Sequence, residues 1–109
     1  MRLYHNPRCS KSRQALALLE IRNLDFEVYL YLDHGVSVGD LDLLMSLDGI
    51  IRTGDETFRN SGIDSGDSAG LRTLLLKNPS LLQRPILIAN GRAAIGRPPE
   101  NILTLLHDA

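Results

Sequence analysis

The dipeptide Asn90-Gly91 stands between two short apolar runs and is the strongest hairpin signal in this sequence of 109 residues. It predicts that a strand over residues 85–89 turns back into an antiparallel strand over residues 92–95. A final helix is expected to open at the proline pair that follows and to run through Leu106. The last part of the chain is therefore predicted to have the order ββα.

The first part of the chain alternates between strand and helix patterns. Residues 2–5 are typical of a short strand, and Asn6-Pro7 ends it as a turn signal. In residues 10–21, Ala15, Leu18 and Leu19 follow helical spacing. Residues 26–32 are rich in strand-forming types and partly alternate, which predicts a second strand. The order βαβ followed by ββα is the skeleton of a thioredoxin-like α/β domain.

The polar middle of the chain is predicted to be helical. Ser37 is a candidate helix N-cap, and Asp40 can complete a capping box with it. That helix is expected to stop at Gly49, and further helices are predicted over residues 56–60 and 68–76. We therefore predict one α/β domain over residues 1–109: a thioredoxin-like fold whose βαβ and ββα halves flank a helical insertion, approximately residues 36–78.

Composition excludes several functional classes. One cysteine cannot form an internal disulfide or a thiolate zinc cluster, and we expect no metal site. A net charge of −1 argues against nucleic acid as a partner. No apolar run reaches the roughly 18 residues of a membrane span, and the first residues lack a signal-peptide pattern. We expect a cytoplasmic monomer with no membrane partner.

The near-neutral total hides an uneven distribution of charge. Residues 1–22 carry a net charge of +4, residues 23–70 carry −8, and residues 71–109 carry +3. The two basic blocks are the two halves of the predicted sheet. If these halves fold together, they create a basic face on a neutral protein.

Cys9 is the candidate nucleophile because it follows a predicted strand and opens a predicted helix. The free N–H groups and the dipole of a helix start stabilise a thiolate, and the same geometry binds oxyanions. His5 could add a positive charge or a hydrogen bond, and Ser12 is expected to donate a hydroxyl hydrogen bond to the thiolate. A polar first-turn serine without that role fits the spacing equally well, and a small buried cysteine is the alternative for Cys9.

Three arginines are candidates for the same site. Arg84 precedes Pro85, and in a thioredoxin layout this proline is commonly cis and faces the cysteine loop. Arg97 ends the predicted hairpin and is placed to converge with Arg84. Arg52 follows an apolar pair and is harder to place. For any single arginine, a solvated surface charge is the alternative.

Five segments of this sequence resemble the glutaredoxin-linked arsenate reductase family, and together they span nearly the whole chain. They are His5-Asn6-Pro7-Arg8-Cys9-Ser10-Lys11-Ser12-Arg13, Tyr31-Leu32, Ile51-Arg52, Asn78-Pro79 through Gln83-Arg84-Pro85-Ile86, and Gly96-Arg97-Pro98-Pro99-Glu100. The first is similar to that family's active-site loop, roughly His-Asn-Pro-x-Cys-x-x-Ser-Arg. The chain departs from the family in residues 33–40, which lack a proline pair, and in residues 57–62.

The resemblance implies roles for the candidate residues. Cys9 would attack arsenate, with His5 and Ser12 favouring its thiolate. The oxyanion would be bound by Arg52, Arg84 and Arg97, whose planar guanidinium groups donate paired hydrogen bonds. It also implies glutathione as co-substrate, glutaredoxin as partner and no bound cofactor. Glutathione would attack the cysteine–arsenic adduct, arsenite would leave, and glutaredoxin would resolve the mixed disulfide.

Two other functions remain open from the sequence. A monothiol glutaredoxin-like thiol transferase would use Cys9 on glutathione mixed disulfides, although Ser10-Lys11-Ser12 lacks the aromatic residue and glycine usual after that cysteine. A non-enzymatic adaptor or regulator on the same fold is the third reading. Because Ser12 stands where the related regulators often carry a second cysteine, a disulfide switch within one chain is excluded.

Overall fold

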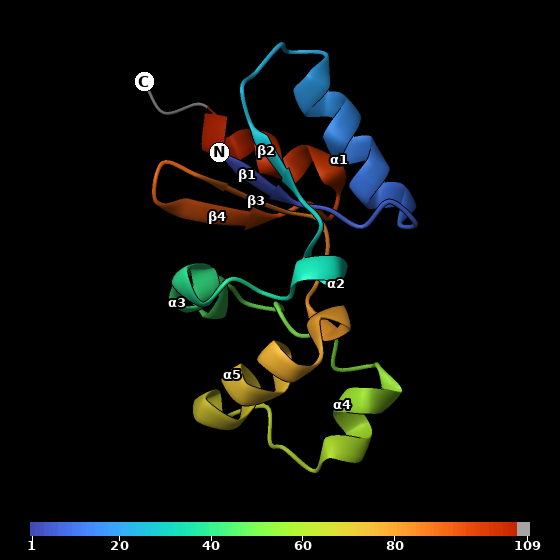
Figure 1. The fold of residues 1–109 in the computed structure, drawn as a ribbon, viewed down its shortest axis with the longest axis vertical. Coiled ribbons are helices and arrows are strands. Elements are labelled where there is room, and N and C mark those ends of the chain that lie inside the picture. The colour runs from blue at the N-terminus through green and yellow to red at the C-terminus, as the bar shows by residue number, and fades with distance from the viewer. Residues whose placement is uncertain (107–109) are drawn as a thin grey trace.

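The computed structural model describes residues 1–106. Its sheet has the strand order β2-β1-β3-β4 (Figure 1). The strands are β1 (Arg2–Tyr4), β2 (Glu27–Tyr29), β3 (Ile86–Ala89) and β4 (Arg92–Ile95). β1 pairs parallel with β2 and antiparallel with β3, and β3 pairs antiparallel with β4. The predicted thioredoxin-like α/β arrangement is confirmed.

Helices complete the fold. They are α1 (Ser10–Glu20), α2 (Tyr31–His34), η1 (Val38–Asp40), α3 (Leu41–Met45), α4 (Glu56–Ser61), α5 (Ser68–Lys77), η2 (Pro79–Leu81) and η3 (Pro99–Leu106), where η marks a 3₁₀ helix. The final helix has the predicted extent but is 3₁₀. We refer to residues 31–81, from α2 to η2, as the helical lobe. Figure 1 shows α1 and the final helix beside the sheet, and α2, α3, α4 and α5 in a separate group below the sheet.

The two faces of the sheet pack against different parts of the chain. Because successive strand residues point to opposite faces, Leu3 and Leu87 pack with Ala15 of α1 and Ile102 of η3. The neighbouring strand residues, such as Tyr4, instead join the core of the helical lobe. The sheet therefore holds α1 on one side and the lobe on the other.

The hairpin turn confirms the prediction from Asn90-Gly91. Asn90 has φ 57° and Gly91 has φ 73°, so both turn residues adopt positive φ, as a type I′ turn requires. Asparagine and glycine tolerate this region better than other residues. The turn aligns β4 on β3, with Ile86 opposite Ile95.

Three local predictions were wrong, the first being that a helix stops at Gly49, because α3 ends at Met45. The expected strand over residues 26–32 ends at Tyr29, opposite the last residue of β1, and the chain turns at once into α2. The expected capping box also does not form, because Ser37 makes no side-chain cap bond. Asp40 instead accepts hydrogen bonds from Arg2 (2.6 Å) and the Tyr4 hydroxyl (2.7 Å), which fasten the lobe to β1.

Candidate active site

Cys9 is the N-cap residue of α1, directly after the loop that leaves β1. Its backbone is extended (φ −95°, ψ 123°), and its side chain makes no cap bond to the helix. Burial raises the pKa of the Cys9 thiol, but hydrogen bonds from the Ser12 backbone, the Arg84 side chain and the Lys11 backbone outweigh it. The pKa of Cys9 is therefore lower than that of an ordinary thiol, as expected for a nucleophile at a helix start.

His5 and Ser12 form a buried pair beneath the cysteine loop. His5 Nδ1 lies 2.6 Å from Ser12 Oγ, and the Asn6 backbone N–H donates to the same oxygen at 2.9 Å. The predicted bond from the Ser12 hydroxyl to the thiolate is replaced in the described structure by these contacts at Ser12 Oγ, and the backbone N–H of Ser12 serves the thiol. The pair fixes the loop that presents Cys9.

Of the two roles expected for His5, a positive charge and a hydrogen bond, the structure supports only the hydrogen bond. It is 5% exposed, and burial together with the positive charge of Arg13 lowers its pKa. A histidine with a lowered pKa is uncharged at neutral pH. His5 therefore contributes a hydrogen bond to Ser12 and no positive charge to the site.

Arg84 lies close enough to Cys9 to act on its thiol. The Arg84-Pro85 peptide bond is cis, which agrees with the hypothesis from the thioredoxin layout. The Arg84 guanidinium lowers the pKa of Cys9 through both a hydrogen bond and its charge. Its Nε is buried and has no hydrogen-bond partner within residues 1–106.

Arg52 and Arg97 line one hollow of about 460 Å³, together with Gln83 and Asp55. Arg97 Nε donates to the Arg84 carbonyl at 2.9 Å. The Arg52 side chain is 33% exposed and lies 3.6 Å from the Asp55 carboxylate. Their terminal groups stay accessible, so both arginines can donate to an anion in this hollow.

A short backbone pairing explains why Arg52 lies near Arg84. Ile51 and Leu82 form an antiparallel bridge. The Arg52 N–H donates to Leu81 O at 2.8 Å, and the Gln83 N–H donates to Ile50 O at 2.7 Å. The structure thus brings together the candidates from the cysteine loop and all three candidate arginines.

Tyr31 is a residue of this site that reasoning from the residues missed. It opens α2 and is fully buried. Burial raises its pKa, while the charges of Arg84 and Arg52 lower it and that of Cys9 raises it. The Tyr31-Leu32 pair within the family resemblance was its only signal in the sequence.

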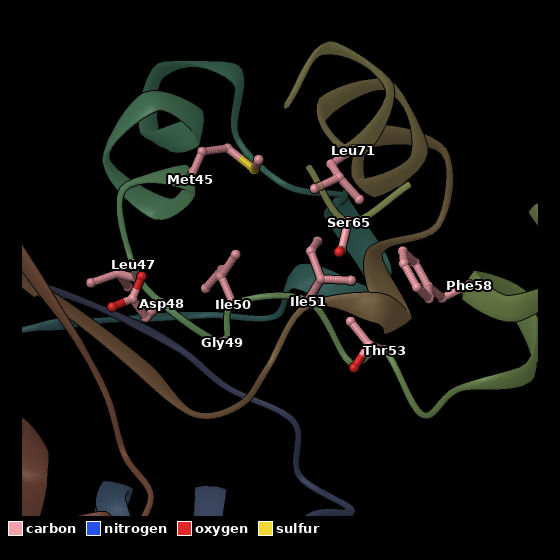
Figure 2. A pocket seen from close by; sticks show the side chains of 10 residues that line it. All are labelled: Met45, Leu47, Asp48, Gly49, Ile50, Ile51, Thr53, Phe58, Ser65 and Leu71. Atoms are coloured by element: carbon pink, nitrogen blue, oxygen red, sulfur yellow. The ribbon is translucent and has the colours of Figure 1, made fainter. Parts of the chain in front are cut away.

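A second, more apolar hollow of about 260 Å³ lies within the helical lobe. Figure 2 shows Met45 of α3 and Leu71 of α5 pointing toward each other near Ile51, with Phe58 of α4 alongside. Neither Cys9 nor any of the three candidate arginines lines it. The thiol and the candidate arginines therefore lie outside this hollow.

Two further observations concern the chain through residue 106. Within that part, histidine, cysteine, aspartate and glutamate side chains form no cluster of three or more suited to a metal ion. None of its helices combines the length and apolar character needed to cross a membrane.

Comparisons with known proteins agree with this geometry. Residues 4–105 match the ArsC family. An arsenate reductase of Neisseria meningitidis is 43% identical, with 97% of each chain covered, and one of Haemophilus influenzae is 39% identical, with 95% of this chain and 97% of the relative covered. The solved structure of an arsenate reductase from Vibrio cholerae has a TM-score of 0.85 and 36% identity, covering 96% of this chain and 98% of that one. These relatives are arsenate reductases, and the family match covers nearly the whole chain. The chain therefore belongs to the ArsC family.

Proposed function

We propose that this protein reduces arsenate to arsenite with Cys9 as its nucleophile. The observation that carries the proposal is the Cys9 thiol itself, which lies at an open helix start with a lowered pKa and with Arg84 against it. A thiolate is the reactive form of cysteine, and arginine is suited to an oxyanion. The relatives that carry the name arsenate reductase support this substrate.

The first step forms a sulfur–arsenic bond. The Cys9 thiolate attacks the arsenic atom, an arsenic–oxygen bond breaks, and the oxygen leaves as water after accepting protons. Arg52, Arg84 and Arg97 bind the remaining oxygens. Guanidinium groups keep their charge throughout, so they stabilise the negative charge of the adduct without proton transfer.

Glutathione supplies the second thiol, because the chain holds one cysteine. The glutathione sulfur bonds to the Cys9 sulfur in a mixed disulfide, and the sulfur–arsenic bond breaks. The two sulfur atoms lose two electrons, arsenic gains them, and arsenite leaves. Glutaredoxin then attacks the glutathione sulfur and releases the Cys9 thiolate. This scheme needs no bound cofactor and no second subunit, and the reducing cytoplasm supplies both thiols.

Arsenite production by the purified chain with glutathione and glutaredoxin tests the proposal. Wild-type protein is expected to turn over arsenate, and Cys9→Ser is expected to have no activity above the uncatalysed rate. Omitting glutaredoxin should stop the wild type after one turnover, with glutathione attached to Cys9 in the mass spectrum. A wild type that reduces glutathione mixed disulfides but not arsenate would instead establish a thiol transferase.

A further inference from the structure

Tyr31 carries a buried hydroxyl that has no hydrogen-bond partner within residues 1–106. The side chain is 0% exposed, and its ring stacks on Tyr4 with centroids 6.0 Å apart. Buried polar groups are nearly always hydrogen-bonded, because leaving one unpaired is unfavourable. This hydroxyl therefore needs a hydrogen-bond partner that residues 1–106 do not supply.

The other two tyrosines of the same stack have their hydroxyls occupied. Tyr4 donates to Asp40 at 2.7 Å, and Tyr29 donates to the Gly35 carbonyl at 2.6 Å. The rings of Tyr4 and Tyr29 lie 4.7 Å apart, so the three side chains form one continuous aromatic group. Within it, Tyr31 alone leaves its hydroxyl unpaired.

The free hydroxyl of Tyr31 lies at the candidate active site. The charges of Arg84, Cys9 and Arg52 all act on it. Arg84 Nε is the other buried side-chain polar atom in the described chain that lacks a partner. Two unpaired groups that converge on one thiol fit a ligand with several acceptor oxygens.

We propose that the Tyr31 hydroxyl donates a hydrogen bond to an oxygen of the oxyanion bound between Cys9 and Arg84. This inference rests on the proposed function, because it assigns a further residue to the same substrate. Burial raises the pKa of Tyr31, so its hydroxyl stays protonated at neutral pH and can donate. The Asn6 amide also lowers that pKa, although it makes no hydrogen bond to the phenol oxygen, and an amide N–H near that oxygen leaves the hydroxyl proton for the ligand.

Tyr31→Phe tests the proposal because it removes the hydroxyl and keeps the ring in the stack. We expect kcat/KM for arsenate to fall about tenfold or more, mainly through a higher KM, since a lost hydrogen bond to a charged group has this effect. The KM for glutathione and the rate of Cys9 alkylation by iodoacetamide without oxyanion are expected to stay within twofold. Tyr29→Phe is the matched control and is expected to leave the arsenate constants unchanged.

A second measurement separates this inference from the proposed function. Arsenate or phosphate is expected to protect wild-type Cys9 from iodoacetamide, and Tyr31→Phe is expected to need about tenfold more anion for the same protection. If the wild type does not reduce arsenate but shows this protection difference, the role of Tyr31 stands and the proposed function fails. Equal protection and equal arsenate constants in the two proteins would overturn the role of Tyr31 while the function stands.

Thermal unfolding without anion completes the test. Because the hydroxyl has no partner, its removal is expected to leave Tm unchanged or raise it. A Tm several degrees lower in Tyr31→Phe would reveal a structural partner for the hydroxyl and overturn the proposal. Failure of both anions to protect wild-type Cys9 would overturn it as well.

Discussion

The helices of this protein begin in two different ways. In the lobe, α4 and α5 begin behind aspartates whose side chains accept backbone hydrogen bonds: Asp55 from Thr57 at 2.9 Å and Asp67 from Gly70 at 3.0 Å. In the sheet half, α1 begins behind Cys9, which makes no such bond, and its first turn carries no acid.

In α4 and α5 the helix start contributes to the stability of the helix, and in α1 it contributes to the reactivity of the Cys9 thiol. A capping carboxylate satisfies the free N–H groups of a helix start and adds a favourable negative charge. At α1 the N–H groups of Lys11 and Ser12 act on the Cys9 sulfur instead. The same backbone geometry therefore stabilises a helix in the lobe and a thiolate at the site.

The sharpest way to break the contrast is to give α1 the kind of start that α4 and α5 have. Cys9→Asp is expected to reduce arsenate turnover by at least about a thousandfold, because the nucleophile is lost. It is also expected to raise the free energy of unfolding by about 1 kcal/mol, because the carboxylate caps the helix. Turnover assays and urea titration measure the two effects, with Cys9→Ala as the inactive control without a cap. A Cys9→Asp protein no more stable than Cys9→Ala would contradict the comparison.

Removing Arg84 tests the positive charge that acts on the Cys9 thiol at the start of α1. Arg84→Gln is expected to lower kcat/KM for arsenate roughly ten- to a hundredfold through the lost charged hydrogen bond. It should also raise the pKa of Cys9, because Arg84 lowers that pKa in the wild type. Since only the thiolate reacts, alkylation speeds up as pH rises through the Cys9 pKa, and the midpoint of that profile should move to higher pH. Arg92→Gln, on the exposed start of β4, is the control; an unmoved midpoint in Arg84→Gln would exclude its action on the thiol.

Ser12→Ala separates the hydroxyl of Ser12 from its backbone. The variant leaves the Asn6 N–H and His5 Nδ1 unpaired in a buried place, so the free energy of unfolding should fall by about 1–3 kcal/mol. The thiol receives its bond from the Ser12 backbone, so the alkylation midpoint of Cys9 should stay where it is. A midpoint moved to higher pH would restore a direct role for the hydroxyl. Ser10→Ala, at an exposed position of the same turn, should change stability by less than about 0.5 kcal/mol.

The smallest expected effect lies in the lobe. Asp67→Ala removes the cap of α5 and should lower the free energy of unfolding by about 1 kcal/mol. The alkylation rate of Cys9 should remain unchanged, because no group of α5 acts on its thiol. Asp67→Asn, which keeps a capping oxygen, should retain most of the stability. A change in Cys9 reactivity on either substitution would couple the lobe cap to the site.

Local chemistry made the sheet half predictable from the sequence. Asn90-Gly91 encodes its own turn because both residues tolerate positive φ, and the position of Cys9 follows from one strand, one turn and one helix start. These signals depend only on residues that are adjacent in the sequence. The cis bond before Pro85 was a hypothesis from the thioredoxin layout, and the structure confirms it.

Predictions failed where a distant partner decides the local structure. Asp40 was expected to complete a capping box with Ser37, but it accepts hydrogen bonds from Arg2 and Tyr4 of β1 instead. Tyr31 continued a strand-like pattern, yet β2 ends where its one neighbour β1 ends, so Tyr31 enters the core. Arg52 could be assigned only through the family resemblance, because its position depends on the pairing of Ile51 with Leu82.

That pairing has a consequence for how such a protein can vary. The hydrogen bonds from Arg52 N to Leu81 O and from Gln83 N to Ile50 O clamp the chain at both ends of the segment between them. The separation of the Arg52 and Arg84 backbones is thus set at the clamp, whatever the intervening helices look like. Residues 53–80 can change in length and sequence as long as both ends return to it. This part of the lobe is free to diverge while Arg52 and Arg84 keep their spacing.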